Sequence, residues 1–296
     1  AIDNATLSTA GIAIIKAVKN VGVLELTSTT AETTVDFADV NTINAFSFSG
    51  EITDLDGATG NAGANGAAAD NAALMLTGVE NSDTFTVSAN KAGGAGGAGG
   101  AGAQGNIGGT GGDGGNGSTG SNAINITEDL VGGANTITLT LTGGIRLDGG
   151  RGGDGGRGGN GIGTGVGGNS GNGGSGGNGV NAVSFETINI VSSGTTANSI
   201  EGGDAGGPGI PGNGVGIGAN GIAGVLGTAG SSVVINTSGT INVTGTQDLN
   251  LGTISGTAAT VDGSLFTGKL TVIGEAGNNV IKGGSKADKI TGGDGT

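Results

Sequence analysis

Carboxylates are the side chains of this chain best able to do chemistry. Its 296 residues include 24 Asp and Glu against 10 Lys and Arg, which gives a net charge of −14. Paired carboxylates such as Asp54 with Asp56, or Glu128 with Asp129, could serve a hydrolase or lyase as acid and base. An Arg could assist such a pair, but neighbouring acidic residues are more often turn or solvated positions, and the sequence shows no clustered carboxylates with an aromatic substrate cleft. We therefore expect no enzyme and no catalytic residue.

The residue types that are missing exclude further chemistry. The sequence contains no Cys, His, Trp or Tyr, which removes thiol catalysis, disulfides, Ser-His-Asp triads and His-ligated zinc. The acidic balance argues against nucleic acid as a partner, because phosphates are neutralised by clusters of Lys and Arg. Carboxylate oxygens suit a hard cation such as Ca²⁺. No apolar run approaches the ~20 residues of a membrane span, and the first twenty residues do not read as a signal peptide.

Glycine dominates the elements that must position these groups, with 74 residues in the chain. Between Ala92 and Gly120 it occupies every third position without a miss. A flexible linker needs no such register, whereas polyproline II has three residues per turn. Gly at every third position would leave one face of each helix bare, so that neighbouring helices can approach closely. The structural glycines of this tract are Gly93, Gly96, Gly99, Gly102, Gly105, Gly108, Gly111, Gly114, Gly117 and Gly120.

The same period recurs in a short tract at 57–66 and in long tracts at 149–179 and 203–230. Each long tract reads as an excursion out and back, with tips at "AQGN" and "GIGTGV". Collagen shares the period but needs abundant proline, and this chain has two. We therefore expect a bundle of polyglycine-II helices, with flexible low-complexity loops as the alternative.

That bundle makes a prediction about substitutions. Replacing Gly99 or Gly111 by Val should disrupt it, whereas changes at Ala98 or Asn116 should be tolerated. A second expectation concerns charge, since Arg151, Asp154 and Arg157 are three residues apart and share a face of a polyproline-II helix. They could form an ion-pair ladder that sets register, although a surface pair contributes only ~0–1 kcal/mol.

Strand patterns separate the glycine tracts. "NTITLTLTGG" at 135–144 alternates apolar and Thr residues, as a half-buried strand does. Each long tract returns to a similar strand, "SNAINI", "VNAVSF" or "SSVVIN", as insertions in a solenoid do. The expected fold is all-β, with β-solenoid or β-sandwich-like strands and the bundle inserted between them; Thr9–Lys19 is the one candidate for a short helix. The expected regions are 1–91 (mainly β, with the short tract 57–66), 92–230 (strands with tracts 92–120, 149–179 and 203–230), 231–273 (β) and 274–296.

The C-terminal residues "GEAGNNVIKGGSKADKITGGDGT" divide into units of nine. They resemble the glycine-rich nonapeptide of RTX, or hemolysin-type, proteins. The resemblance implies that 274–296 begins a parallel β-roll, with Ile281 and Ile290 inside it and Ca²⁺ as the cofactor. The sequence departs from the pattern where Asn279 replaces the first Asp and Lys286 a glycine. The calcium-binding residues implied are Asp288, Asn279, Asp294, Gly284 and Gly293.

Just upstream, "VDGSLFTGKLTV" followed by "GNNVI" resembles segments that precede RTX repeats in bacterial surface-layer proteins. The resemblance implies type I secretion, an extracellular or bacterial cell-surface location, and Ca²⁺-supported self-assembly into an S-layer, filament or matrix. Expected partners are copies of the chain itself and a cell-surface polysaccharide. The glycine tracts are similar to the polyglycine-II bundles of phage tail-tip adhesins and insect antifreeze proteins. The alternative function is therefore an adhesin, receptor-binding or ice-binding module that displays a rigid bundle.

Overall fold

The structure is a computed structural model, and it contains strands and extended segments but no helix among the residues it describes. These residues are 65–69, 72–104, 110–128, 135–161, 165–214, 218–236, 238–256 and 258–293, with the backbone of five short strands before them. The expected helix at Thr9–Lys19 and the pair Asp54 and Asp56 lie outside these residues. The all-β expectation is confirmed for the part of the chain that is described.

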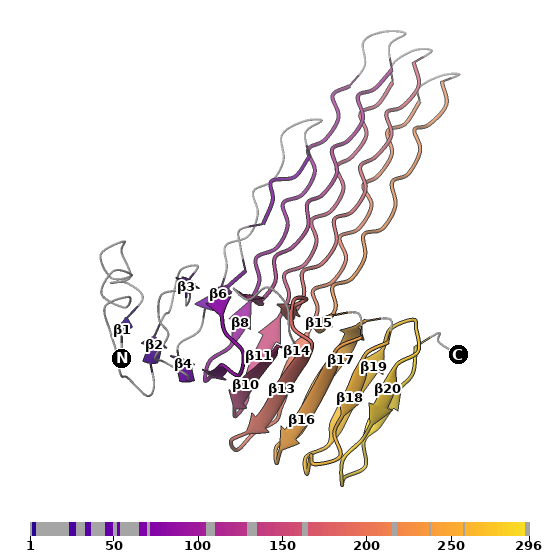
Figure 1. Cartoon of the computed structure of the whole chain (residues 1–296). Coiled ribbons are helices and arrows are strands. Elements are labelled where there is room, and N and C mark those ends of the chain that lie inside the picture. Colours follow the sequence, from indigo (N-terminus) through magenta and orange to yellow (C-terminus); the bar gives the residue numbers. More distant parts are fainter. Residues whose placement is uncertain are drawn as a thin grey trace.

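All strands pair in parallel and form two sheets (Figure 1). The first sheet runs in the order β1 (Ile2–Asp3), β2 (Leu24–Thr27), β4 (Ala45–Ser49), β7 (Thr84–Val87), β10 (Thr136–Thr142), β13 (Thr187–Ser193), β16 (Thr240–Gly245), β18 (Thr260–Asp262) and β20 (Val280–Lys282). The second runs β3 (Thr33–Asp36), β6 (Leu74–Val79), β9 (Ile124–Glu128), β12 (Val180–Ala182), β15 (Val233–Ile235), β17 (Leu249–Ser255), β14 (Asn198–Glu201), β11 (Arg146–Asp148), β8 (Lys91–Ala92) and β5 (Ile52–Thr53), with β19 (Leu270–Gly274) between β17 and β21 (Lys289–Thr291). This arrangement is solenoid-like, whereas β-sandwiches are built of antiparallel sheets.

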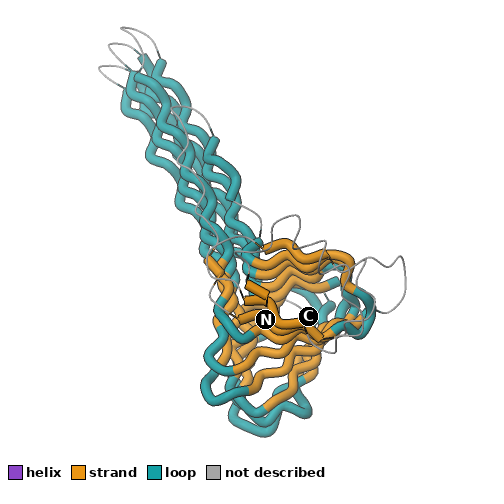
Figure 2. The backbone as a smooth tube through the Cα atoms, turned by 90° about the vertical axis from the view of Figure 1, so that its left-hand side faces the viewer, coloured by secondary structure: helices purple, strands orange, loops and turns teal. Residues whose placement is uncertain are grey.

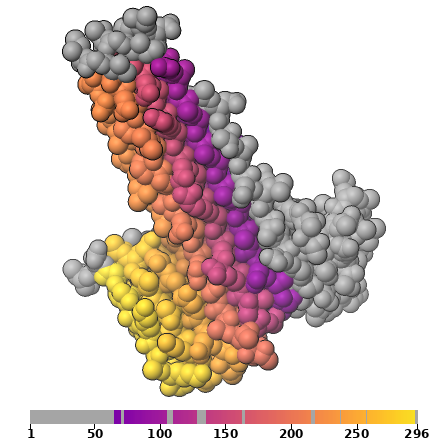
Figure 3. Space-filling model, turned by 180° about the vertical axis from the view of Figure 1, so that it is seen from behind, coloured from indigo at the N-terminus to yellow at the C-terminus, as the bar shows by residue number. Residues whose placement is uncertain are grey.

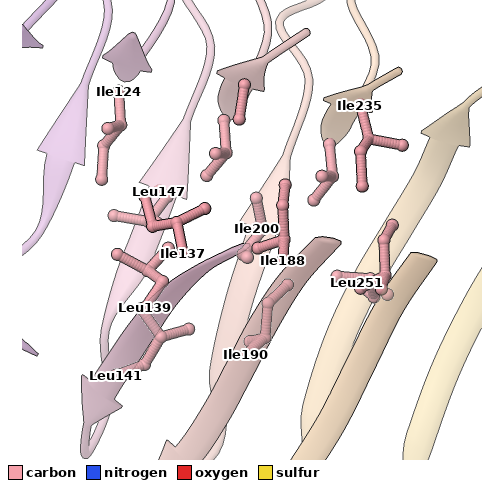
Figure 4. Close-up of a cluster of buried hydrophobic side chains, with 14 of the residues drawn as sticks. Ile124, Ile137, Leu139, Leu141, Leu147, Ile188, Ile190, Ile200, Ile235 and Leu251 are labelled. Carbon is pink, nitrogen blue, oxygen red and sulfur yellow. The ribbon is translucent and has the colours of Figure 1, made fainter. Parts of the chain in front are cut away.

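Alternating residues place the core between the two sheets. In β10, Ile137, Leu139 and Leu141 are buried while the Thr residues between them are half-buried, as a period of two requires. The parallel register stacks like on like, because Ile137 pairs with Ile188 and Ile188 with Ile241. Aliphatic side chains from successive turns therefore form continuous stacks in the core (Figure 4).

The length of a solenoid turn shows where the glycine tracts belong. Asn189 and Asn242 bond across neighbouring strands although they are 53 residues apart, whereas Ala259 and Asn279 do so at a separation of 20. The longer turns contain a glycine tract and the shorter ones do not. The tracts are therefore insertions into a short basic turn.

The insertion point lies in the middle of a strand. β14 ends before the tract 203–230 and β15 begins after it, yet both pair with the single strand β17. At the corresponding point of β17, Gly252 has a φ of +54° and the register shifts. A Cβ there would lie 2.0 Å from Oγ of Ser232, just after the tract. Each tract is thus an excursion from within the second sheet, along the line that separates β14 from β15.

Among the described residues, six extended glycine segments lie side by side, three leaving the second sheet and three returning to it (Figure 2). Their backbone N–H groups donate to neighbouring segments at every third residue, as from Gly153 to Ser118 and from Gly156 to Gly115, at 2.7–2.8 Å. Outgoing segments form one layer and returning segments the other. We call this element the glycine array; its segments are 93–104, 149–161 and 202–214 (outgoing) and 110–121, 165–178 and 218–230 (returning), with 65–69 beside them.

Candidate functional site

The interior of the glycine array has no room for side chains. A Cβ added to Gly99 would lie 1.9 Å from the carbonyl oxygen of Gly115, and one on Gly156 would lie 2.1 Å from that of Gly100. Eight of the ten glycines singled out between Ala92 and Gly120 have a backbone oxygen within 2.1 Å of such an atom. The other two, Gly105 and Gly108, lie outside the described residues. Glycine there permits the backbone contacts that hold the segments together.

Asn side chains fasten the returning layer from its outer face. Oδ1 of Asn116 accepts the backbone N–H of Asn172 at 2.8 Å, and Oδ1 of Asn172 accepts that of Val225 at 2.9 Å. We call this surface the Asn face. Its other bonds of the same kind run from Asn116 to Asn65, from Asn169 to Asp113, from Ile222 to Asn169, from Asn178 to Asn122 and from Ser231 to Asn178.

The outer face of the outgoing layer carries the charges. Arg151 and Asp154 form an ion pair at 2.5 Å, and Oδ1 of Asp154 also accepts the N–H of Gly207 at 2.7 Å. The hydrogen bond from Arg151 is the main cause that lowers the pKa of Asp154 below its usual value. Asn160 accepts the N–H of Asn213 in the same way. The first half of the expected ladder is present, while Arg157 forms no ion pair with Asp154 among the described residues.

The last two segments close the array on one long side (Figure 3). Here the positions that would face a further segment carry side chains: Pro208 and Pro211 on 202–214, and Leu226 on 218–230. Leu226 is 63% exposed. We call this surface the proline edge; it consists of Ala205, Pro208, Pro211, Ala223, Leu226 and Ala229. Three further apolar residues border it, Ile210 on the outgoing segment and Ile222 and Val225 on the returning one.

The residues implied as calcium ligands lie in the last turn of the solenoid. Both carboxylate oxygens of Asp288 accept backbone N–H groups, from Leu270 at 2.8 Å and from Gly284 at 2.6 Å. Asn279 accepts the N–H of Ala259 and donates to the carbonyl of Glu275. Gly284 lies in the loop between β20 and β21, Gly293 follows β21, and Asp294 lies outside the described residues. Among these residues no group of three or more Asp and Glu is placed to share a metal ion.

The apolar residues expected inside the roll differ from each other. Ile281 in β20 packs against the hydrophobic core, whereas Ile290 in β21 is 43% exposed. β20 continues the first sheet and β21 the second. The residues 274–293 thus form a further turn of the same solenoid.

Sequence reasoning found the glycines but not the Asn face or the proline edge. The signal for the first is a recurrence of Asn, Asp, Thr and Ser every third residue in the second half of the tracts 92–120 and 149–179. The signal for the second is that both prolines of the chain occur in the last tract. Neither signal identifies a partner until the order of the segments is known.

Comparison with known proteins adds little. No protein-family description matches the chain, and no curated protein matches it. Among solved structures, a springtail antifreeze protein from Granisotoma rainieri, a nine polyproline type II helical bundle, is 26% identical. The match covers 59% of this chain and 93% of that chain, with a TM-score of 0.19. That score is too low to establish a shared fold. No helix among the described residues is long and apolar enough to cross a membrane.

Proposed function

We propose that this chain is a secreted structural protein of the bacterial cell surface, in which a β-solenoid carries a polyglycine-II bundle and copies assemble into a layer, filament or matrix. The observation that supports it best is the hydrogen bonding of the glycine array. Backbone N–H groups at a period of three meet carbonyls of neighbouring segments, as from Gly150 to Ser121 at 2.8 Å. Such a lattice gives rigidity and needs no bound ligand.

The side chains of the array support the same proposal. Those on the Asn face are engaged in fastening one segment to the next, so they serve the shape of the molecule. The apolar residues of the proline edge instead remain exposed, as surfaces that meet other proteins often are. A rigid projection with one apolar side is a suitable building unit for an assembly.

Calcium support is part of the proposal through the RTX-like segment 274–296. The resemblance of its nonapeptides motivates this, and the negative charge of the chain favours a cation. The first site would include Asp288, which would exchange hydrogen bonds to backbone N–H groups for a metal ion. Further repeats of this kind would strengthen the effect.

Negative-stain electron microscopy of the purified protein in millimolar Ca²⁺, and again after chelation, tests this function. We expect sheets or filaments in Ca²⁺ that disperse on chelation. Assemblies that persist after chelation would remove calcium from the proposal and keep the structural role. Single particles under both conditions, over the whole accessible concentration range, would contradict the structural role.

The exposed apolar side chains favour a second candidate, a binding module that presents the rigid array to a receptor or to ice. Val225 and Ile222 are 65% and 74% exposed, on an array whose interior has no room to bury them. An ice-recrystallisation assay and a glycan array separate this candidate from the first. Activity in either assay by a protein that stays monomeric would favour the binding module.

A further inference from the structure

At the proline edge, the last outgoing segment lacks two backbone donors that the outgoing segment before it supplies. In the 149–161 segment, Gly155 and Gly158 donate their N–H groups to the carbonyls of Gly207 and Ile210, at 2.9 Å each. One segment further on, the equivalent positions are Pro208 and Pro211. Proline has no N–H. The last outgoing segment therefore cannot make these two hydrogen bonds to a further segment.

The last returning segment also differs from the returning segment before it. Gly173 and Gly176 donate to the carbonyls of Val225 and Thr228 at 2.9 and 2.8 Å, and a Cβ on Gly173 would lie 1.9 Å from the carbonyl oxygen of Gly206. The equivalent residues of the last segment are Leu226 and Ala229. Their side chains occupy the space that a neighbouring backbone would need. The edge thus blocks a further glycine segment and offers apolar side chains in its place.

Charge also sets this edge apart. The stretch 205–230 contains no charged residue, in a chain whose net charge is −14. The outer face of the outgoing layer carries Arg151, Asp154 and Arg157, and the Asn face carries Asp113. Two copies of an acidic protein repel each other, and this repulsion is weakest where each presents an uncharged surface. The charge distribution therefore favours the proline edge as the place where copies meet.

We propose that the proline edge docks against the proline edge of a second copy of this chain, around a two-fold axis. Both surfaces are straight, since twelve residues of polyproline II span ~37 Å, and a two-fold contact needs only one self-complementary patch. Side chains of Ile222, Leu226 and Ile210 supply the apolar area, and their exposed fractions are 74%, 63% and 66%. The inference rests on the proposed self-assembly and names its interface.

This contact is a narrow one, because only two segments contribute to it on each side. Stable protein interfaces bury about 800 Å² per partner, so we expect a reversible dimer whose population depends on concentration. Within a larger assembly, several such contacts act together and strengthen one another. The glycine lattice itself remains within each copy.

Sedimentation velocity over a wide concentration range, on the whole chain, tests the interface. The variant carries Ile222→Asp and Leu226→Asp; the matched control carries Thr110→Asp and Thr119→Asp, at exposed positions away from the edge. We expect wild type and control to dimerise alike, and the edge variant to dimerise at least about tenfold more weakly, because like charges meet at its interface. Circular dichroism verifies that all three proteins are folded.

The outcomes separate this inference from the proposed function. An edge variant that dimerises as wild type does overturns the interface and leaves self-assembly standing. A wild type that stays monomeric in sedimentation and forms no assemblies in electron microscopy overturns both. A wild type that stays monomeric and inhibits ice recrystallisation, with the edge variant inactive, assigns the edge to a different ligand and also overturns the dimer.

Discussion

Oδ1 of Asn172 accepts the backbone N–H of Val225 at 2.9 Å, and the N–H of Asn172 itself donates to Oδ1 of Asn116 at 2.8 Å. Each Asn thus joins the segment before it to the segment after it. Asn116 in turn donates its N–H to Asn65. The returning layer is fastened along this line by side chains in addition to backbone bonds. Because the Asn side chain is short, its Oδ1 reaches only the N–H directly opposite on the next segment, so the line also fixes the register of the segments.

Asn172→Ala should therefore destabilise the protein by about 1 kcal/mol, the usual cost of one hydrogen bond. Asn172→Asp should cost much less, because it keeps the acceptor, as Asp113 does for the N–H of Asn169. Thermal and urea unfolding measure both. Asn213→Ala is the control, since its side chain has no hydrogen-bond partner among the described residues. Equal losses for Asn172→Ala and Asn213→Ala would contradict the role given to the Asn face.

Gly99→Ala is predicted to be far more damaging than Ala98→Ser, its neighbour. The added Cβ at Gly99 would lie 1.9 Å from the carbonyl oxygen of Gly115 and 2.7 Å from the N of Gly156. Backbone atoms on both sides cannot turn away, so we expect a loss of about 3 kcal/mol or more. Ala98 lies on the outer face of the outgoing layer, where a hydroxyl can reach water. Similar unfolding midpoints for the two variants would refute the close packing of the array.

The glycine period was informative because only glycine permits such close contact between backbones. The spacing of the glycines therefore indicates which residues face a neighbouring segment. The alternation in 135–144 likewise predicted β10 and its buried face. The prediction that Asn116 tolerates change is revised, because its Oδ1 holds the N–H of Asn172. That bond joins residues 56 positions apart, and no local pattern predicts which segment becomes the neighbour. Likewise, the role of Pro208 and Pro211 at the edge of the array follows only from their position on the last outgoing segment.

The buried carboxyl of Asp83 predicts a pH dependence of stability. Burial raises the pKa of Asp83 from its usual 3.8 to about 6, partly offset by the hydrogen bond from the N–H of Glu80. The folded protein therefore holds this proton more tightly than the unfolded chain does. The stabilisation is complete below pH 3.8 and is lost as the pH rises through about 6.

Asp83→Asn removes that titration and keeps an acceptor for Glu80. Relative to wild type, its melting temperature should rise as the pH increases from 3 to 7, a range that brackets the two pKa values. Asp204→Asn, which neutralises an exposed carboxylate, is the control for the loss of one negative charge. A difference between Asp83→Asn and wild type that is the same at all pH values would contradict the raised pKa.

Asp288→Asn distinguishes a structural carboxylate from a calcium ligand. Both oxygens of Asp288 accept backbone N–H groups, and an amide retains one acceptor. With chelator we expect a loss of about 1–2 kcal/mol from the hydrogen bonds, and in millimolar Ca²⁺ a larger loss, because the proposed calcium site includes Asp288. Differential scanning fluorimetry under the two conditions measures it. Equal losses under the two conditions would show that Asp288 is a structural carboxylate and would remove it from the proposed calcium site.

Removing the last excursion tests how the array ends. β17 crosses without interruption the point where the tract 203–230 leaves the preceding turn. Replacing residues 201–231 by one glycine would copy this, since Ile200-Gly-Ser232 then matches Leu251-Gly252-Thr253. We expect the solenoid to fold, because its strands retain their register, and circular dichroism should show its β-signal.

The shortened array would end on a different kind of edge. Gly155 and Gly158 would lose the acceptors Gly207 and Ile210 and present unpaired N–H groups, which invite pairing with another chain, as at an open sheet edge. We expect higher-order association of the deletion variant in sedimentation. In the wild type, Pro208 and Pro211 stand at the equivalent positions of the last outgoing segment and have no N–H to offer. A deletion variant that associates no more than wild type would show that hydration satisfies such an edge, and that the two prolines are not what ends the array.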